Sequence, residues 1–493
     1  MNIREAKNYI KDTVSAYLKK DEFGDYRIPV EKQRPIFLLG SPGIGKTAIM
    51  SQIAGELDIA LVSYSMTHHT RQSALGLPFI QEKTYGNRKV SVSEYTMSEI
   101  IAGMYDTMEE SGITEGILFL DEINCVSETL YPSMLLFLQY KLFGKHAVPP
   151  GWVIVTAGNP PEYNRAVREF DVVTLDRMKV LKVEADYPAW AAYASERAVH
   201  GAVTGFLESN RESFYKVETT AYGKTYVTGR GWEDLSDMIK LYEEDNKSVN
   251  ESLISQYITD EKTIKEFAAY YDLYCKYKKR YEIESVFTTG PDDETAEAAA
   301  KAPVDERLAL TSLLFDTIRS EIRQVLLTEK QLRAIRPAIS PLIGSGSAEV
   351  SDKLEELAAK ETAETDRRDR AGNLSSSDRT MRKHLVAFYT RAKERVDKGE
   401  GIKEIFNESV LSLKADTDRE LSRIDCMFSA MEKIFGRQSN EMLVLVTNLT
   451  LNPDTSEFLL NHRSASYGEY SSVLQVEDRG SKLRKQILAL EEL

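Results

Sequence analysis

The residues with the clearest chemical meaning form a glycine-rich run near the N-terminus. Gly40-Ser41-Pro42-Gly43-Ile44-Gly45-Lys46-Thr47 fits the pattern G-x-x-x-x-G-K-[ST] at every fixed position. Glycines let such a loop curl so that its N–H groups point at one anion, and the helix that follows adds the positive end of its dipole. We expect Lys46 to reach the β- and γ-phosphates of a nucleotide and the Thr47 hydroxyl to ligate Mg²⁺. The alternative is an ordinary glycine-rich turn between a strand and a helix.

Two carboxylates follow an apolar run that has the length of a buried strand. The residues Ile117-Leu118-Phe119-Leu120 end in Asp121 and Glu122. A parallel strand delivers its last residues to the carboxyl edge of its sheet, where a phosphate loop also lies. We therefore predict that Asp121 holds Mg²⁺ through water and that Glu122 polarises the attacking water. The alternative is a strand that ends in two solvated acids.

A third strand end carries an amide. Trp152 to Ala157 is an apolar run that continues as Gly158-Asn159-Pro160. An Asn at a neighbouring strand end can orient the same water that Glu122 polarises, and Asn159 is our candidate for this role. Taken alone, the Asn-Pro pair indicates only a turn.

The sequence favours ATP over GTP. The pattern Asn-Lys-x-Asp, which reads guanine, is absent, and the single Asn-Lys pair, Asn246-Lys247, continues with Ser-Val. We therefore predict ATP and Mg²⁺ as the ligands of the phosphate loop.

The elements that must position these residues alternate between strands and helices. Short apolar strands that alternate with helices are typical of an α/β layer with a mainly parallel sheet. We predict this core, a P-loop domain, over residues 1–185. The pattern predicts helices at 3–18, 46–57, 97–110 and 128–142, strands at 35–39, 59–64, 117–120 and 152–157, and a β-hairpin at 79–95.

The rest of the chain is predicted to be helical. Strand signals fade after about residue 186, and residues 186–285 have the spacing of an all-α lid. A stretch with Thr, Gly, Pro and Asp opens a predicted linker at 286–303. Residues 304–493 are predicted to form an all-α C-terminal domain in which we find no chemistry and which we expect to dock a partner or stabilise an assembly.

Composition narrows the class of protein. The chain has 493 residues, and 63 Lys and Arg against 77 Asp and Glu give a formal net charge of −14, which disfavours nucleic acid as a partner. The three cysteines, Cys125, Cys275 and Cys426, are far apart and indicate a reducing compartment. With charges at its N-terminus and no run of 18 apolar residues, the chain is predicted to be cytoplasmic and not to span a membrane.

The sequence resembles an AAA+ ATPase, and specifically the MoxR-like branch, which is related to the dynein and midasin AAA modules. The resemblance covers about residues 30–285, a little over half of the chain. The motifs that carry it are the phosphate loop 40–47, Leu120-Asp121-Glu122, Thr156-Ala157-Gly158-Asn159-Pro160, Leu175-Asp176-Arg177 and Thr228-Gly229-Arg230-Gly231-Trp232.

The resemblance assigns further roles. It implies that Asn159 is sensor 1, that Arg177 is an arginine finger acting on the neighbouring subunit, and that Arg230 is sensor 2. Relatives tend to have Asp-Arg-Phe where this chain has Asp-Arg-Met at 176–178, so Arg165 and Arg168 remain alternatives for the finger.

The resemblance also implies an assembly and a task. Family members usually form hexameric rings, and MoxR-like ones commonly work with a partner that carries a von Willebrand factor A domain. In such a ring the hairpin would face the pore, which makes Phe79 and Tyr85 candidates for contacts with a client. Our expectation is a ring-forming ATPase that remodels or assembles a protein partner. The rival hypotheses are a motor or restriction-type ATPase stimulated by nucleic acid, and a scaffold that binds ATP and barely hydrolyses it.

Overall fold

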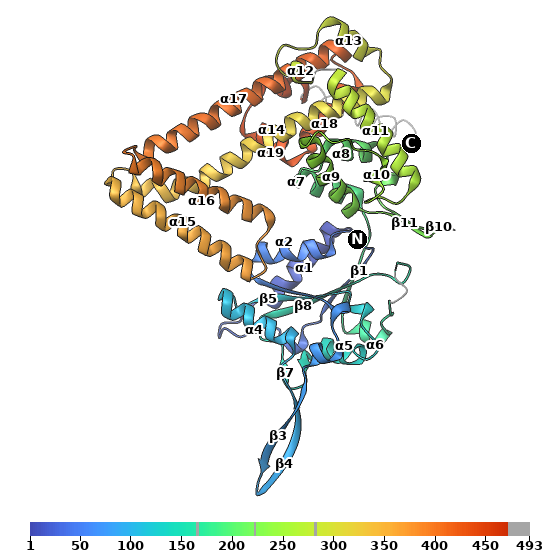
Figure 1. Cartoon of the computed structure of the whole chain (residues 1–493), viewed down its shortest axis with the longest axis vertical. Helices are drawn as coiled ribbons and strands as arrows, with labels where there is room; N and C mark the ends of the chain where they lie inside the picture. Colours follow the sequence, from blue (N-terminus) through green and yellow to red (C-terminus); the bar gives the residue numbers. More distant parts are fainter. Residues whose placement is uncertain (164–166, 221–222, 281–282, 472–493) are drawn as a thin grey trace, which may run out of the picture. The chain divides into compact units, whose positions relative to one another are not determined.

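The computed structural model describes residues 1–163, 167–220, 223–280 and 283–471 (Figure 1). The chain divides into two compact units. The first consists of Met1–Ala189 and Leu354–Thr390, and the second of Trp190–Lys353 and Arg391–Leu493. No helix in the described part of the chain is both long enough and apolar enough to cross a bilayer.

A five-stranded parallel sheet forms the centre of the first unit. The register aligns the carboxyl ends of its strands, with Leu39 beside Gly158 and Ser65 beside Asp121. The strand between the phosphate loop and the carboxylates is therefore the one that ends near Asn159. In spatial order the strands are β2 (Ala60–Ser65), β5 (Gly116–Asp121), β8 (Trp152–Gly158), β1 (Ile36–Gly40) and β9 (Lys179–Val183).

Helices cover both faces of this sheet. Alternate residues of β5 point to opposite faces: Ile117 and Phe119 pack in one apolar cluster, and Leu118 and Leu120 pack in the other. Because both faces are buried, the central strands are continuous apolar runs, which is why the sequence predicted them. One cluster includes α1 (Ile3–Tyr17) and α2 (Lys46–Leu57), and the other includes α4 (Glu99–Ser111) and α5 (Tyr131–Tyr140).

The strand β9 was missed by the sequence analysis. Two of its five residues are lysines, and Leu181 and Val183 are buried while Lys182 is exposed. As an edge strand it pairs with β1 alone, and lysines are common on such edges because they discourage pairing with other chains. A half-exposed edge strand that contains lysines gives a weaker signal in the sequence than the continuous apolar runs of the central strands.

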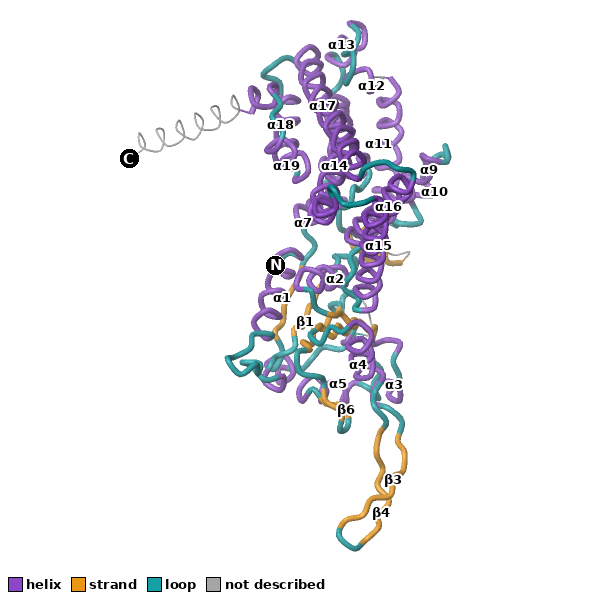
Figure 2. Tube along the Cα trace, turned by 90° about the vertical axis from the view of Figure 1, so that its left-hand side faces the viewer, coloured by secondary structure: helices purple, strands orange, loops and turns teal. Residues whose placement is uncertain are grey.

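The predicted hairpin is present as β3 (Pro78–Tyr85) and β4 (Arg88–Tyr95), which extend together away from the sheet (Figures 1 and 2). Its base is tied by Glu94, whose carboxylate forms ion pairs with Lys83 and with Lys145. The second of these lysines lies in the turn between β6 (Leu142–Phe143) and β7 (His146–Ala147).

The second unit is mainly helical, as predicted, but it contains one β-hairpin. The strands β10 (Lys216–Thr220) and β11 (Gly223–Val227) form this hairpin inside the range predicted as an all-α lid. Polar residues dominate β10, which explains why periodicity did not reveal it. The expected fold class, a parallel α/β sheet followed by a largely helical region, is confirmed.

The compact units group the predicted segments differently from our boundaries. The long helix α14 (Val304–Ile339) packs against α8 (Gly201–Ser209) and α11 (Glu261–Arg280), so parts of the predicted lid and C-terminal domain share one unit. The predicted linker 286–303 contains the helix α13 (Asp293–Ala300), capped by Asp292. Periodicity predicts that these regions are helical, but it does not predict which helices pack against one another.

Two glutamates, Glu321 and Glu420, form an acidic pair where α14 packs against α17 (Ile402–Phe435). Glu321 Oε2 lies 2.9 Å from Arg423 Nε, and Glu420, on the same helix as Arg423, is 1% exposed. The guanidinium of Arg423 also pairs with Glu284 and lies over the Phe287 ring. Burial, with a further contribution from the neighbouring Glu420 and opposed by Arg423, raises the pKa of Glu321 to about 7.

This pair predicts a pH-dependent stability. An acid whose pKa rises on folding stabilises the fold fully below its unfolded value of 4.5, and that contribution is lost as the pH rises through about 7. We expect Glu321→Gln to raise the Tm at pH 8 by about 2–4 °C, which corresponds to ~1 kcal/mol in a unit of this size, and by less at pH 5. Thermal denaturation followed by circular dichroism measures both values. The control is Glu394→Gln, an exposed position on α16 (Ser376–Asp397). An equal gain at both pH values would contradict this assignment.

Candidate functional site

The phosphate loop lies between β1 and α2, as the sequence predicted. Gly43 and Gly45 adopt φ values of +74° and +92°, a conformation that residues with a Cβ rarely take. No side chain caps the first turn of α2. The amino end of this helix therefore presents backbone N–H groups without a capping side chain, which is the arrangement that binds phosphate in glycine-rich loops.

Lys46 is held in a fixed position at the first residue of α2. Its ammonium donates to the carbonyl oxygens of Gly40 and Ser41, each at 2.8 Å, and to Asn159 Oδ1 at 2.9 Å. The residue is only 8% exposed. A buried ammonium is tolerated when oxygens surround it, and these contacts place the charge beside the loop. The same contacts bring the predicted residues Lys46 and Asn159 together.

Thr47 and Asp121 meet as the metal hypothesis requires. The Thr47 hydroxyl donates to Asp121 Oδ2 over 2.9 Å, which joins the start of α2 to the end of β5. Hydroxyl and carboxylate oxygens are the hard ligands that Mg²⁺ prefers, and Mg²⁺ in nucleotide sites is usually held by one or two protein groups together with phosphates and water. The donor set therefore fits Mg²⁺.

Glu122 sits next to Asp121 with its backbone in the left-handed region, at φ +55°. Its N–H donates to Asp121 Oδ1 at 2.9 Å. Its Oε2 accepts hydrogen bonds from the hydroxyls of Ser65 at 2.9 Å and Thr67 at 2.8 Å. The Glu122 carboxylate is therefore oriented by two hydroxyls, one on the last residue of β2 and one just after that strand.

Sequence analysis missed Ser65 and Thr67. The segment Ser63-Tyr64-Ser65-Met66-Thr67 ends a predicted strand with hydroxyl residues, which is a weak signal on its own. That signal gains meaning only from the strand order, because β2 lies beside β5 and aligns Ser65 with Asp121.

The turn after β8 is fixed by Asn124, which sequence analysis also did not single out. Its Nδ2 donates to the carbonyl oxygen of Asn159 at 2.8 Å, and its own carbonyl oxygen accepts from the Arg168 N–H at 2.8 Å. Asn124 thus links the segment that carries Glu122 to the segment that carries Asn159.

The thiol of Cys125 lies close to these carboxylates. Burial and the negative charges of Glu122 and Asp121 raise its pKa. The thiol is therefore kept protonated, which does not favour a nucleophilic role.

The candidate arginines differ in their surroundings. Arg177 is exposed at the end of α6 (Val172–Asp176) and makes no side-chain hydrogen bond or ion pair with the residues that the structure describes. Arg168 forms an ion pair with Glu128 and lies over the Tyr131 ring. Arg165 lies outside the described residues. Arg230 belongs to the second unit, exposed in the first turn of α9 (Gly229–Glu244), and its role as sensor 2 stays a prediction.

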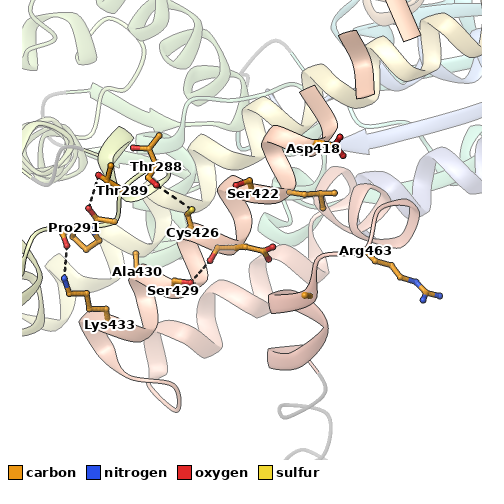
Figure 3. A pocket seen from close by; sticks show the side chains of 14 residues that line it. Thr288, Thr289, Pro291, Asp418, Ser422, Cys426, Ser429, Ala430, Lys433 and Arg463 are labelled. Atoms are coloured by element: carbon orange, nitrogen blue, oxygen red, sulfur yellow. Dashed lines mark hydrogen bonds between the residues drawn. The ribbon is translucent and has the colours of Figure 1, made fainter. Parts of the chain in front are cut away.

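A separate cavity of about 700 Å³ lies in the second unit between α17, the loop at 288–291 and residues near 463 (Figure 3). Lys433 Nζ donates to the Pro291 carbonyl oxygen at 3.0 Å on one side of it, and Asp418 and Asp425 contribute carboxylates. It contains neither a glycine-rich loop nor any of the predicted site residues.

Comparison with known proteins agrees with this site. Residues 36–173 match the model of one family, described as "ATPase family associated with various cellular activities (AAA)". The match extends from β1 into α6 and includes the phosphate loop, both carboxylates and Asn159. This match to an AAA domain lies within the first unit and supports an AAA+ ATPase.

Matches outside this family model add little. No curated protein matches the chain. Among solved structures, the crystal structure of NtrX from Brucella abortus is similar with 13% sequence identity and a TM-score of 0.28. The similarity covers 64% of this chain and 66% of NtrX, just under two thirds of that protein.

The position of the Lys46 ammonium predicts the effect of removing it. We expect Lys46→Ala to weaken binding of ATP by at least about tenfold, because a charge-assisted hydrogen bond contributes roughly 1.5–3 kcal/mol and 1.4 kcal/mol is a factor of ten. Isothermal titration calorimetry with a non-hydrolysable ATP analogue measures the affinity. The control Lys32→Ala removes an exposed lysine before β1 and should bind like the parent. Equal affinity of both variants would contradict the phosphate loop.

Proposed function

We propose that this chain is an ATPase that assembles into a ring and uses ATP hydrolysis to remodel or assemble a protein partner. The observation that carries the proposal is the convergence of Lys46, Thr47, Asp121, Glu122 and Asn159 at one edge of the sheet, joined by hydrogen bonds of 2.9 Å or less. Each of these groups has a distinct task in phosphoryl transfer.

The chain's own residues divide the work between binding and activation. Lys46 places a fixed positive charge where the β- and γ-phosphates are expected, and the N–H groups of the loop bind the same oxygens. Thr47 and Asp121 would hold Mg²⁺, which supplies charge neutralisation on the phosphates when bound. Glu122 orients and polarises the attacking water, and Asn159 contributes its amide next to Lys46.

The finer assignment rests on the resemblance to MoxR-like AAA+ proteins. We propose a homo-oligomeric ring, with six subunits as in that family, in which Arg177 reaches the site of a neighbouring subunit and Arg230 senses the nucleotide. We also propose a partner with a von Willebrand factor A domain. Within the described residues Arg177 makes no side-chain hydrogen bond or ion pair, whereas Arg168 is paired with Glu128, and this difference supports Arg177 over Arg168.

Hydrolysis is tested first by removing the proposed base. We expect the parent to hydrolyse ATP and Glu122→Gln to bind ATP but hydrolyse it at least about 100-fold more slowly, because general base catalysis contributes roughly 10²–10⁴ in rate. The control Glu109→Gln changes an exposed acid of α4 and should keep the parent rate. A coupled assay of phosphate release, with and without DNA, measures all three proteins.

The same assay separates the rival functions. If the parent hydrolysed ATP as slowly as Glu122→Gln does, only the hypothesis of an ATP-binding scaffold would remain. Strong stimulation by DNA that falls steeply with salt would favour the nucleic-acid motor instead.

The arginine finger predicts complementation between two inactive variants. We expect Arg177→Ala to lower kcat by roughly 10³-fold without weakening ATP binding, since a finger stabilises charge only in the transition state. Arg168→Ala should have a much smaller effect. Mixing Arg177→Ala with Glu122→Gln should restore part of the activity, because a site with an intact Glu122 then receives Arg177 from its neighbour. A mixture that stays inactive would argue against action between subunits.

A further inference from the structure

The turn between α15 (Ser347–Arg370) and α16 packs on the edge of the AAA sheet. Residues 354–390 belong to the first unit although they lie far along the chain. The N–H of Leu61 in β2 donates to the carbonyl oxygen of Ala371 over 2.7 Å, and Ala371 is fully buried. On its other side β2 pairs with β5. The turn therefore covers an edge of the sheet that would otherwise be open to another strand.

The fit between the turn and the edge is close. Gly372 has φ +68°, and a Cβ at this position would lie 2.4 Å from the carbonyl oxygen of Leu61. The neighbouring Asn373 is fully buried, and neither atom of its amide has a hydrogen-bond partner in the part of the chain that the structure describes.

Charged side chains also join the end of α15 to the connection between α2 and β2 and to the end of α4. Arg368 Nη2 lies 3.0 Å from a carboxylate oxygen of Asp58, which ends α2. Arg367 Nε donates to the carbonyl oxygen of Ser111 at 3.2 Å, at the end of α4. The last turn of α15 and the turn after it thus contact both ends of the segment 58–61, at Asp58 and at Leu61.

The segment 58–61 connects α2 to β2, and both of these elements contribute to the candidate site. Helix α2 begins with Lys46 and Thr47, and β2 ends at Ser65, which together with Thr67 holds the carboxylate of Glu122. Leu61 and Ser65 are four residues apart on one strand, about 13 Å at the usual rise. A shift of β2 would displace the two hydroxyls relative to Glu122, which directly follows the neighbouring strand β5.

We propose that the α15–α16 turn, through Gly372 and Arg368, positions Glu122 by holding β2 in register. Both are positioning residues: Gly372 lies against β2, Arg368 contacts the segment before β2, and neither is among the residues proposed to bind the nucleotide. The inference rests on the proposed ATPase function and adds a control element to it. Both helices continue into the second unit.

The kinetic test compares one small substitution in two backgrounds. We expect Gly372→Ala to lower kcat about tenfold, within the effect of a 1 Å displacement of a catalytic group, with KM within about twofold of the parent. In the background Ser65→Ala with Thr67→Val, where the hydroxyls are already missing, the same substitution should have no further effect. The control Gly24→Ala has similar backbone strain at φ +88° but meets nothing within 4 Å. If Gly372→Ala lowered kcat by the same factor in both backgrounds, the proposal would be overturned. It would also be overturned if Gly24→Ala lowered kcat as much as Gly372→Ala does.

A second measurement does not depend on hydrolysis or on tolerance of Gly372→Ala. In Arg368→Ala and Asp58→Ala, hydrogen exchange should accelerate at residues 60–65 and also at 122–125, and the double variant should exchange like either single one. Faster exchange at 60–65 alone would show that the turn docks without positioning Glu122, and it would overturn the inference. If the parent hydrolyses no ATP, the proposed function fails, and the exchange result still decides whether the turn reaches Glu122.

Discussion

A buried ammonium fixes the geometry of the whole site. Lys46 is placed by two carbonyl oxygens of its own loop and by the amide oxygen of Asn159, so β1, α2 and the end of β8 converge on one charge. This is possible because parallel strands end at the same edge of their sheet. The strand order then adds β5 with its carboxylates, and β2 with the hydroxyls that orient Glu122.

Sequence predicted the parts of the site that carry local signals. Lys46, Thr47, Asp121, Glu122 and Asn159 were found because each follows a buried apolar strand or lies in a glycine-rich loop, and the structure brings them together. Ser65, Thr67 and Asn124 were missed because their importance comes from which strands are neighbours in space. The roles of Arg177 and Arg230 depend on a neighbouring subunit or on the second unit, so they stay predictions.

The helical regions show the same division between local and long-range information. Apolar periodicity predicted four helices of the core with their bounds, and after residue 186 it predicted helical regions without individual helices. Their packing partners were not predicted: α14 shares one unit with most of the predicted lid, and residues 354–390 belong to the first unit, more than 160 residues after the last strand of its sheet. The contact between Leu61 and Ala371 is a single backbone hydrogen bond, for which a sequence carries no motif.

The thiol of Cys125, which lies beside Asp121 and Glu122, has a consequence for redox chemistry. Oxidants and alkylating reagents attack thiolates, and the negative charge of Asp121 and Glu122 together with burial suppresses the thiolate of Cys125. A cysteine placed next to the acids of a nucleotide site is thus protected by those same acids. Reagents that need a thiolate should therefore react slowly with Cys125.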